Sequence, residues 1–159
     1  MKTVVLKFGG TSVGGLDRIK KVAKIIATYQ KKKSKIIVVS SAMSGTTNDL
    51  INKSKKISNN FDRAEYDCLL ASGEQIACSL IAGRLNHLGI KSRSWMSWQI
   101  PIITYGPHSA SKIYKIYKKE ILKYINSGGI PIIPGFQGIN SFNRITTLGR
   151  GGSDVSAIM

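Results

Sequence analysis

Cysteine is rare in this sequence, and its scarcity excludes two kinds of stabilised protein. The 159 residues contain only Cys68 and Cys78, which form no CxxC pair and have no histidine at metal-ligand spacing. A disulfide framework and a structural zinc site are therefore excluded. We expect both thiols to be buried, because free cysteine is usually an interior residue.

Long hydrophobic runs are missing as well. The longest uninterrupted aliphatic run covers residues 36–39, far below the roughly 18 apolar residues that a membrane-spanning helix needs. The first eight residues, MKTVVLKF, are too short, and are interrupted too early by Lys7, to form the apolar region of a signal peptide. We therefore expect a cytoplasmic protein with no membrane partner.

Linkers rich in proline, glycine or serine are absent, and so are internal repeats. A chain of this length buries roughly 70% of its unfolded surface and so builds its own core. The hydrophobic fraction of 42% and the 16 glycines fit a globular α/β protein. We expect one domain that spans residues 1–159.

Acidic residues are scarce, and so is arginine. Eight aspartates and glutamates stand against 24 basic residues, which gives a formal net charge of +16. A basic surface is typical of nucleic-acid-binding modules, and this class remains an alternative. Lysine outnumbers arginine by 18 to six, although arginine is favoured for bidentate recognition of bases and phosphates. We find no motif that recognises bases and no pattern of aromatic residues on which bases could stack. We therefore expect no specific nucleic-acid partner.

The segment SKIYKIYKKEILKYI, residues 111–125, interleaves lysine with tyrosine and is the strongest feature in favour of that alternative. Its apolar residues recur at helical spacing, as Ile113, Ile116, Tyr117, Ile121 and Tyr124. This pattern predicts a helix whose apolar stripe faces the core while its lysines face water.

Strand and helix patterns alternate along the chain. The continuous apolar run at residues 35–40 predicts a strand buried on both faces. Further strands are predicted in the β-rich run of residues 3–8, near residues 92–98, and around Ile132 and Ile133. Apolar residues at 3.6-residue spacing predict helices at residues 16–32, from about residue 48, and on both sides of Ser72 and Gly73. This alternation predicts the α/β class, as a three-layer α/β/α sandwich with a largely parallel sheet.

Polar, glycine-marked loops are expected at the carboxyl ends of the strands, where ligands bind in such sheets. In KFGGTS, Gly9 and Gly10 let backbone N–H groups approach an anion, Thr11 or Ser12 can bond a phosphate oxygen, and Lys7 adds a positive charge. The spacing of a Walker loop is absent, because the lysine precedes the glycines. The motif alone fits both a phosphate site and a plain tight turn.

Three further loops share this character. SSAMSGTTN is rich in hydroxyls, ASGEQ carries Glu74 among small residues, and GRGGSD places Arg150 and Asp154 around two glycines. Taken alone, Glu74 could equally be an acidic residue in the first turn of a helix, where the helix dipole favours a negative charge. Together, lysine and arginine suit an anionic substrate, glutamate suits an ammonium group, and aspartate suits a divalent metal or an orienting lysine. The combination indicates a site for an amino acid and a nucleotide phosphate.

Five motifs stand in a fixed order in this chain: KFGGTSV, SAMSGTTN, LLASGEQ, PGFQG and TTLGRGGSD. In them the sequence resembles the aspartokinases of the amino-acid kinase family, from about residue 2 to residue 157. KFGGTS together with SGE and GRGGSD is more similar to the aspartate enzymes than to the glutamate 5-kinases, carbamate kinases and uridylate kinases that share the fold. The resemblance implies transfer of the γ-phosphoryl of ATP to the side-chain carboxylate of L-aspartate, giving 4-phospho-L-aspartate on the route to lysine, threonine and methionine.

The resemblance also implies roles on the phosphate side. Lys7 is expected to stabilise the charge on the transferred phosphoryl group, and Asp154 to hold Lys7 in place. The implied cofactor is ATP with Mg²⁺, with Asp154 as the residue that helps to order the magnesium nucleotide. The residues expected to bind the ATP phosphates are Lys7, Gly9, Gly10, Ser12, Gly151 and Gly152.

On the aspartate side, the resemblance implies that Arg150 clamps a substrate carboxylate and Glu74 receives the α-ammonium. The residues expected to add hydroxyl contacts are Ser41, Thr47 and Ser153. The attacking carboxylate is already ionised near neutral pH, so no general base is needed. We therefore expect no role in the reaction for His87, at a helix end, or for His108, in a loop.

The sequence departs from the family after GRGGSD. Aspartokinases continue there with elements that cradle the adenosine, and then with two regulatory ACT domains. We expect residues 1–159 to be the N-terminal portion of an amino-acid kinase catalytic domain, without ACT domains. Two expectations follow: the chain is a truncated, inactive fragment, or a second chain or subunit completes its sheet.

Overall fold

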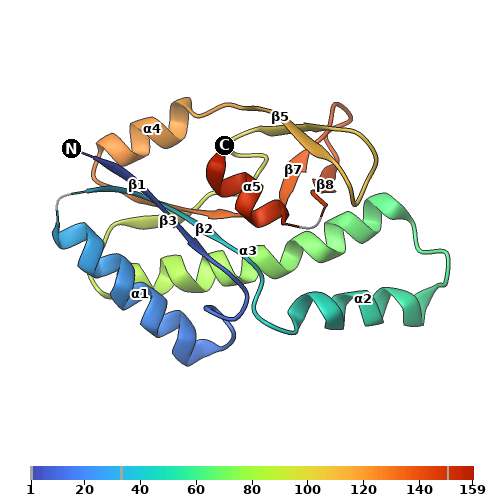
Figure 1. Ribbon diagram of the computed structural model, residues 1–159, viewed down its shortest axis with the longest axis horizontal. Helices are drawn as coiled ribbons and strands as arrows, with labels where there is room; N and C mark the ends of the chain where they lie inside the picture. The colour runs from blue at the N-terminus through green and yellow to red at the C-terminus, as the bar shows by residue number, and fades with distance from the viewer. Residues whose placement is uncertain (1, 33, 150) are drawn as a thin grey trace.

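The computed structural model describes residues 2–32, 34–149 and 151–159. Strands and helices alternate through its first half, and short strands dominate the second half (Figure 1). No helix among these residues is long and apolar enough to cross a membrane. In chain order the elements are β1 (Thr3–Phe8), α1 (Leu16–Lys31), β2 (Lys35–Ser40), α2 (Thr46–Ile57), α3 (Arg63–His87), β3 (Ser92–Ser94), β4 (Ile102–Tyr105), β5 (Lys112–Ile116), α4 (Lys119–Asn126), β6 (Ile130–Pro134), β7 (Gln137–Ile139), β8 (Ile145–Thr147) and α5 (Gly152–Ile158).

A four-stranded sheet with the strand order β1-β2-β6-β3 forms the centre of the molecule. All of its strand pairs are parallel, with Phe8 opposite Ser40 and Ser40 opposite Pro134. The inner strands β2 and β6 are runs of branched apolar residues, which suit a sheet covered on both faces. The strands predicted at residues 3–8 and 35–40 are confirmed with those bounds.

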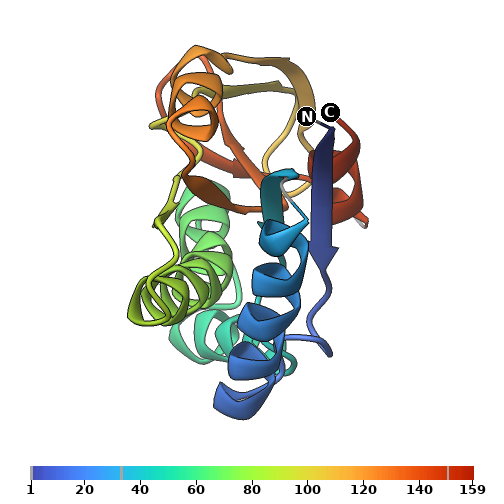
Figure 2. The ribbon, with the colours of Figure 1, turned by 90° about the vertical axis from the view of Figure 1, so that its left-hand side faces the viewer.

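Helices cover both faces of this sheet, with α1 and α3 on one side and α4 on the other (Figure 2). Successive residues of β2 point to opposite faces. Val38 therefore joins the apolar core formed with α1 and α3, whereas Val39 joins the core formed with α4. The predicted three-layer α/β/α sandwich with a parallel sheet is confirmed.

A second sheet lies in the layer that contains α4, and the sequence analysis did not predict it. Its strand order is β5-β4-β7-β8; β5 and β8 run antiparallel to their neighbours, whereas β4 and β7 are parallel. Each strand has only three to five residues. Strands this short carry too few residues to show a period in the sequence.

The helix predicted over residues 111–125 is wrong in its first half. Residues 112–116 form β5 at the edge of the second sheet, and helix begins only at Lys119, in α4. The α4 half of the prediction is confirmed, because Ile121 and Ile125 are buried on one face of that helix.

A β-bulge explains the error in β5. Ile116 lies opposite Ile102 and Ile113 lies opposite Thr104, which leaves Tyr114 as an extra residue in the strand. Ile113 and Ile116 therefore face the same side although they are three residues apart. That spacing imitates the period of a helix.

Helix α3 is continuous through Ser72 and Gly73, where the sequence analysis predicted a break between two helices. Its N-cap is Asp62, whose carboxylate accepts hydrogen bonds from the N–H groups of Ala64 and Glu65. Gly73 does not end the helix. It allows close packing, because a Cβ there would lie 3.0 Å from the Cβ of Ala42.

Two smaller predictions also need correction. The strand predicted at residues 92–98 ends at Ser94, because the chain then folds into turns in which the Gln99 N–H bonds the Met96 carbonyl. Cys78 is buried as expected, and burial raises the pKa of its thiol, but Cys68 is exposed on α3. The helical period turns Cys68 away from the core that Cys78 joins.

Candidate functional site

The parallel sheet brings the ends of three strands to one edge. Phe8, Ser40 and Pro134 share one register, and each is followed at once by a loop. The Ser41 N–H bonds the Phe8 carbonyl at 2.9 Å, and the Gly135 N–H bonds the Ser40 carbonyl at 3.0 Å. The three loops therefore leave the sheet side by side, as expected for the ligand edge of an α/β sheet.

A cavity of about 350 Å³ lies at this edge. The predicted site residues that line it are Lys7, Gly10, Ser41, Thr47, Glu74, Gly151, Gly152, Ser153 and Asp154. Gly9 and Ser12, also predicted, do not line it. Arg150 lies outside the residues that the structure describes.

Lys7 and Asp154 form the charged pair of the cavity. The Lys7 Nζ lies 2.8 Å from the Asp154 carboxylate, although 147 positions separate them in the sequence. Lys7 lies at the end of β1, and Asp154 lies in the first turn of α5, where its N–H bonds the Gly151 carbonyl at 2.9 Å. Lys7 keeps 30% of its side chain exposed, so its ammonium is open to an anion in the cavity.

Glycines allow the loops of the site to approach one another. A Cβ on Gly10 would lie 3.1 Å from the Ala42 carbonyl oxygen, and the Gly10 carbonyl accepts a hydrogen bond from the Ser44 N–H. A Cβ on Gly152 would lie only 2.7 Å from the Leu148 Cβ. Larger residues at these two positions would push apart the loops that surround the cavity.

Gly9 and Ser12 serve a turn rather than the cavity wall. The Gly9 carbonyl accepts hydrogen bonds from the N–H groups of Ser12 and Val13. The Gly9 Cα still lies near the site, since a Cβ there would be 3.5 Å from the Lys7 Nζ.

Glu74 lies on α3 and supplies a buried carboxyl group to the cavity. Its side chain is 5% exposed, and its Oε1 accepts a hydrogen bond from the Ala42 N–H at 3.2 Å. Its Oε2 is buried and has no hydrogen-bond partner among the residues that the structure describes. Burial removes water from the charged form and raises the pKa of Glu74 to about 7, although the Ala42 hydrogen bond opposes this shift. An unpartnered carboxylate oxygen of this kind is suited to a cationic group.

The second loop leads into α2, whose first turn faces the cavity. Gly45 adopts a left-handed conformation with φ of 86°, and α2 begins at the next residue. Thr47 and Asn48, in the first turn, line the cavity together with Ser41. Hydroxyl groups and the N-terminus of this 12-residue helix suit an anionic ligand.

The sequence analysis missed several residues of the cavity wall, namely Ala42, Met43, Ser44, Gly45, Asn48 and Phe136. All of them lie within the motifs SAMSGTTN and PGFQG. Membership of these motifs was the signal in the sequence that could have identified them. Phe136 has a φ of 69°, an uncommon conformation for a residue with a side chain. Its N–H bonds the Ser156 hydroxyl and its carbonyl accepts from the Leu148 N–H, so it joins α5 to the end of β8.

The donor groups of the site bear on metal binding. Among residues 2–32, 34–149 and 151–159, no cluster of three or more His, Cys, Asp or Glu side chains is placed to hold a metal ion. Asp154 offers one carboxylate beside the glycine-rich loops that line the cavity. Mg²⁺ is commonly held by one or two carboxylates together with substrate phosphates, and this donor set fits a Mg²⁺ ion carried by a nucleotide.

Curated relatives of this chain are aspartokinases. An aspartokinase of Rickettsia conorii is 48% identical over the whole of this chain, and an aspartokinase of Geobacillus stearothermophilus is 42% identical over 99% of it. These alignments cover 40% and 39% of the relatives' own lengths. The chain therefore spans about two fifths of the curated relatives that it matches.

Solved structures agree in fold. The aspartate kinase of Synechocystis superposes with a TM-score of 0.82 at 35% identity, over 99% of this chain and 26% of that one. E. coli aspartokinase III, in complex with aspartate and ADP, also gives a TM-score of 0.82, at 22% identity over 97% of this chain and 45% of that one. The model of the amino acid kinase family matches residues 2–159. With both sequence and fold in agreement over nearly its full length, this chain belongs to the amino acid kinase family.

Proposed function

We propose that this cavity is an aspartate kinase site, which transfers the γ-phosphoryl of ATP to the side-chain carboxylate of L-aspartate. One observation carries the proposal: the same cavity is lined by a lysine, Lys7, that suits an anion, and by a buried carboxyl group, Glu74, with an oxygen that has no hydrogen-bond partner in the described part of the chain. The aspartokinase relatives support the choice of substrates, although this chain spans only part of their length.

The phosphate side of the reaction belongs to Lys7. Phosphoryl transfer depends mainly on positioning and on neutralising charge that spreads over the transferred oxygens. The Lys7 ammonium is held at 2.8 Å by Asp154 and still reaches the cavity. It therefore supplies a fixed positive charge without having to reorganise during the reaction.

The aspartate side belongs to Glu74. The α-ammonium of aspartate would give Glu74 Oε2 a partner, which it does not find among the described residues. A bound cation also favours the ionised carboxylate, which lowers the raised pKa of Glu74 towards its ordinary value. Ser41, Thr47 and Ser153 offer hydroxyls around the same cavity, and Arg150 is proposed to bind a substrate carboxylate.

The attacking group needs no base from the protein. A side-chain carboxylate with a pKa of about 4 is ionised at neutral pH and attacks phosphorus directly. Asp154 would help to order the magnesium nucleotide, whose metal ion supplies further neutralisation of the phosphate charge. Gly10, Gly151 and Gly152 would let the backbone approach the phosphates closely.

The experiment that tests this function is an acyl-phosphate assay on the purified chain with aspartate and magnesium ATP, in which hydroxylamine traps the product. Lys7→Ala is expected to lower the rate by roughly 100-fold or more, the usual cost of losing one stabilising group in the transition state. Lys24→Ala is the matched control, because it removes the same charge from an exposed position on α1.

The control should keep the wild-type rate and the wild-type unfolding temperature. Equal rates in the wild type and in Lys7→Ala would contradict the proposal. A wild-type chain without turnover would instead favour the inactive-fragment alternative. Aspartate binding, followed by calorimetry and weakened in Glu74→Gln, would then show whether the substrate half of the site is intact.

A further inference from the structure

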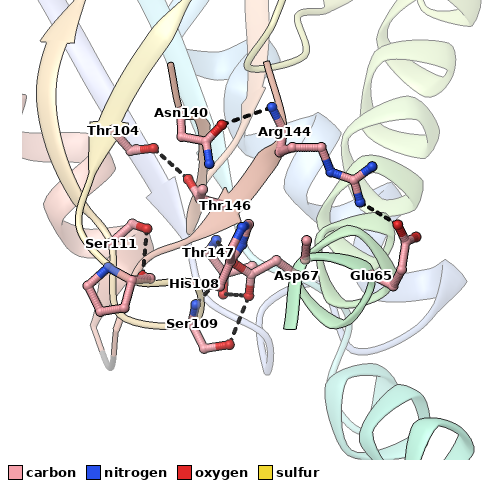
Figure 3. A network of polar contacts seen from close by, with 12 residues as sticks. Glu65, Asp67, Thr104, His108, Ser109, Ser111, Asn140, Arg144, Thr146 and Thr147 are labelled. Carbon is pink, nitrogen blue, oxygen red and sulfur yellow. Dashed lines mark hydrogen bonds and ion pairs between the residues drawn. The ribbon is translucent and has the colours of Figure 1, made fainter. Parts of the chain in front are cut away.

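A second buried carboxylate lies on α3, outside the cavity. Asp67 has no solvent exposure, and its side chain accepts five hydrogen bonds (Figure 3). His108 Nδ1 lies 2.7 Å from Oδ2; Ser109 donates its N–H at 3.0 Å and its hydroxyl at 2.9 Å. Thr147 donates its N–H at 2.9 Å and its hydroxyl at 2.6 Å. The burial of this charge is therefore compensated by converging donors.

These bonds join three parts of the chain that are distant in sequence. Asp67 belongs to α3, Ser109 to the loop between β4 and β5, and Thr147 to the end of β8. Glu74 follows Asp67 by seven residues, which is about two helical turns and places both carboxyl groups on one face of α3. One face of α3 thus bonds the end of β8 and also lines the cavity.

Thr147 ends β8, just before the loop that leads into α5, whose first turn carries Asp154. Its N–H and its hydroxyl bond Asp67, and its carbonyl accepts a hydrogen bond from the Ser111 N–H at 3.1 Å. The next residue, Leu148, bonds the Phe136 carbonyl at 2.8 Å and packs against Gly152. The position of Thr147 therefore determines where the loop between β8 and α5 begins.

The backbone of Ser109 supports the same conclusion. Its φ is 65°, a left-handed conformation that few residues with a side chain adopt. Two hydrogen bonds to Asp67 hold it there. Such conformations persist where the surrounding structure holds them, often beside functional sites.

We propose that Asp67 is a positioning residue for the proposed reaction. It binds Thr147 to α3 and so sets where the chain leaves β8 towards Asp154, relative to Glu74 on α3. The inference rests on the proposed function for its kinetic test, but its structural test is independent of turnover.

Asp67→Asn and Asp67→Ala form the first test. An asparagine keeps the shape, its carbonyl oxygen can accept from the two backbone N–H groups, and its NH₂ can donate to the hydroxyls of Ser109 and Thr147. An alanine leaves all five donors without an acceptor. We expect Asp67→Ala to lower kcat at least tenfold while the KM for aspartate changes less than threefold, and Asp67→Asn to recover most of kcat.

The kinetic result distinguishes positioning from simple stabilisation. Loss of stability alone would reduce the amount of active protein without changing kcat per folded molecule at temperatures well below the unfolding transition. A folded Asp67→Ala variant with wild-type kcat, or an Asp67→Asn variant as slow as the alanine variant, would overturn the inference.

Thr147→Val and Thr146→Val form the second test, which also serves if Asp67→Ala fails to fold. Both changes keep the side-chain shape and remove one buried hydroxyl. Thr147 loses its bond to Asp67, whereas the matched control Thr146 loses its 2.6 Å bond to Thr104 in the second sheet. We expect at least tenfold faster hydrogen–deuterium exchange at the amides of residues 152–155 in Thr147→Val, and unchanged exchange in α1.

Thr146→Val should leave residues 152–155 at the wild-type exchange rate. Equal exchange in the two valine variants would overturn the inference, because the link through Asp67 would then have no separate effect. If the wild-type chain has no turnover, the proposed activity of the chain alone fails, and the exchange rates still decide the role of Asp67.

Discussion

At the scale of single residues, Glu74 combines burial with an incomplete set of hydrogen bonds. In the part of the chain that the structure describes, its Oε1 has one donor, the Ala42 N–H, and its Oε2 has none. Asp67, two turns away on the same helix, has five donors. The contrast indicates that Asp67 is satisfied within the protein, whereas Glu74 is available for a ligand.

Glu74 should make stability depend on pH. Its folded-state pKa of about 7 lies above the ordinary value of 4.5, so the folded protein holds a proton that the unfolded chain releases. This contribution is fully present below pH 4.5 and is lost as pH rises through about 7. We expect the wild type to lose about 3 kcal/mol across that window relative to Glu74→Gln.

Urea unfolding of both proteins at pH values of about 4.5, 6 and 8 measures this difference. Parallel stability curves would show that the Glu74 carboxyl is not desolvated as the structure indicates. Aspartate, if it binds through its ammonium, should also bind more weakly as pH falls below about 7, because Glu74 then becomes neutral.

At the scale of elements, α3 contacts both the site and the core through different residues. Gly73 allows the helix to pass close to Ala42, since a Cβ at this glycine would lie 3.0 Å from the Ala42 Cβ on the side of the cavity. Gly83, ten residues later in the same helix, is exposed, and a Cβ added there would meet no other atom within 4 Å. Alanine substitutions at these two glycines therefore separate the effect of helix propensity on stability from the effect of close packing.

Gly83→Ala should stabilise the protein by up to about 1 kcal/mol, because alanine favours helix over glycine and meets no neighbour. Gly73→Ala gains the same propensity but forces its Cβ against Ala42, whose backbone bonds Glu74. We expect it to be at least about 1 kcal/mol less stable than Gly83→Ala.

Urea unfolding at neutral pH compares the two variants. The packing account of Gly73 fails if Gly73→Ala gains as much stability as Gly83→Ala. Activity adds a second readout, because a shift of Ala42 should weaken aspartate binding in Gly73→Ala and leave Gly83→Ala unchanged.

At the scale of the whole molecule, most of the few acidic residues are already engaged. Within the described residues, four of the eight are in ion pairs with lysine or arginine, and two others are the buried Asp67 and Glu74. The ion pairs are Lys7–Asp154, Lys20–Asp17, Lys53–Asp49 and Arg144–Glu65. Most of the +16 charge is therefore left on the surface.

This surface should attract polyanions without selecting among them. We expect duplex DNA of two unrelated sequences to bind equally at about 50 mM salt, with affinity falling by a factor of about 1,000 or more at about 200 mM, as counterion release dictates for several phosphate contacts. Fluorescence anisotropy over a salt series measures both quantities. Saturable binding to one sequence at physiological salt would favour the nucleic-acid-binding alternative.

Local sequence pattern by itself determined much of the fold. The β-rich run of residues 3–8 and the continuous apolar run of residues 35–40 predicted β1 and β2 with their observed bounds. The continuous run became the inner strand β2, whereas β1 lies at the edge of the sheet with part of its surface exposed. The same reasoning failed at β5, where the bulge at Tyr114 gave Ile113 and Ile116 the spacing of a helix. A bulge depends on the partner strand, which no local window contains.

The motifs likewise predicted the chemistry that we propose for the site, because lysine, glutamate and glycine-rich loops carry their chemical character wherever they fold. Tertiary structure alone decided which of them meet. The pairing of Lys7 with Asp154, the burial of Glu74 under Ala42 and the bonds from Thr147 to Asp67 each join residues at least 32 positions apart. Such contacts depend on sheet register and helix packing, which arise only when the whole core is assembled.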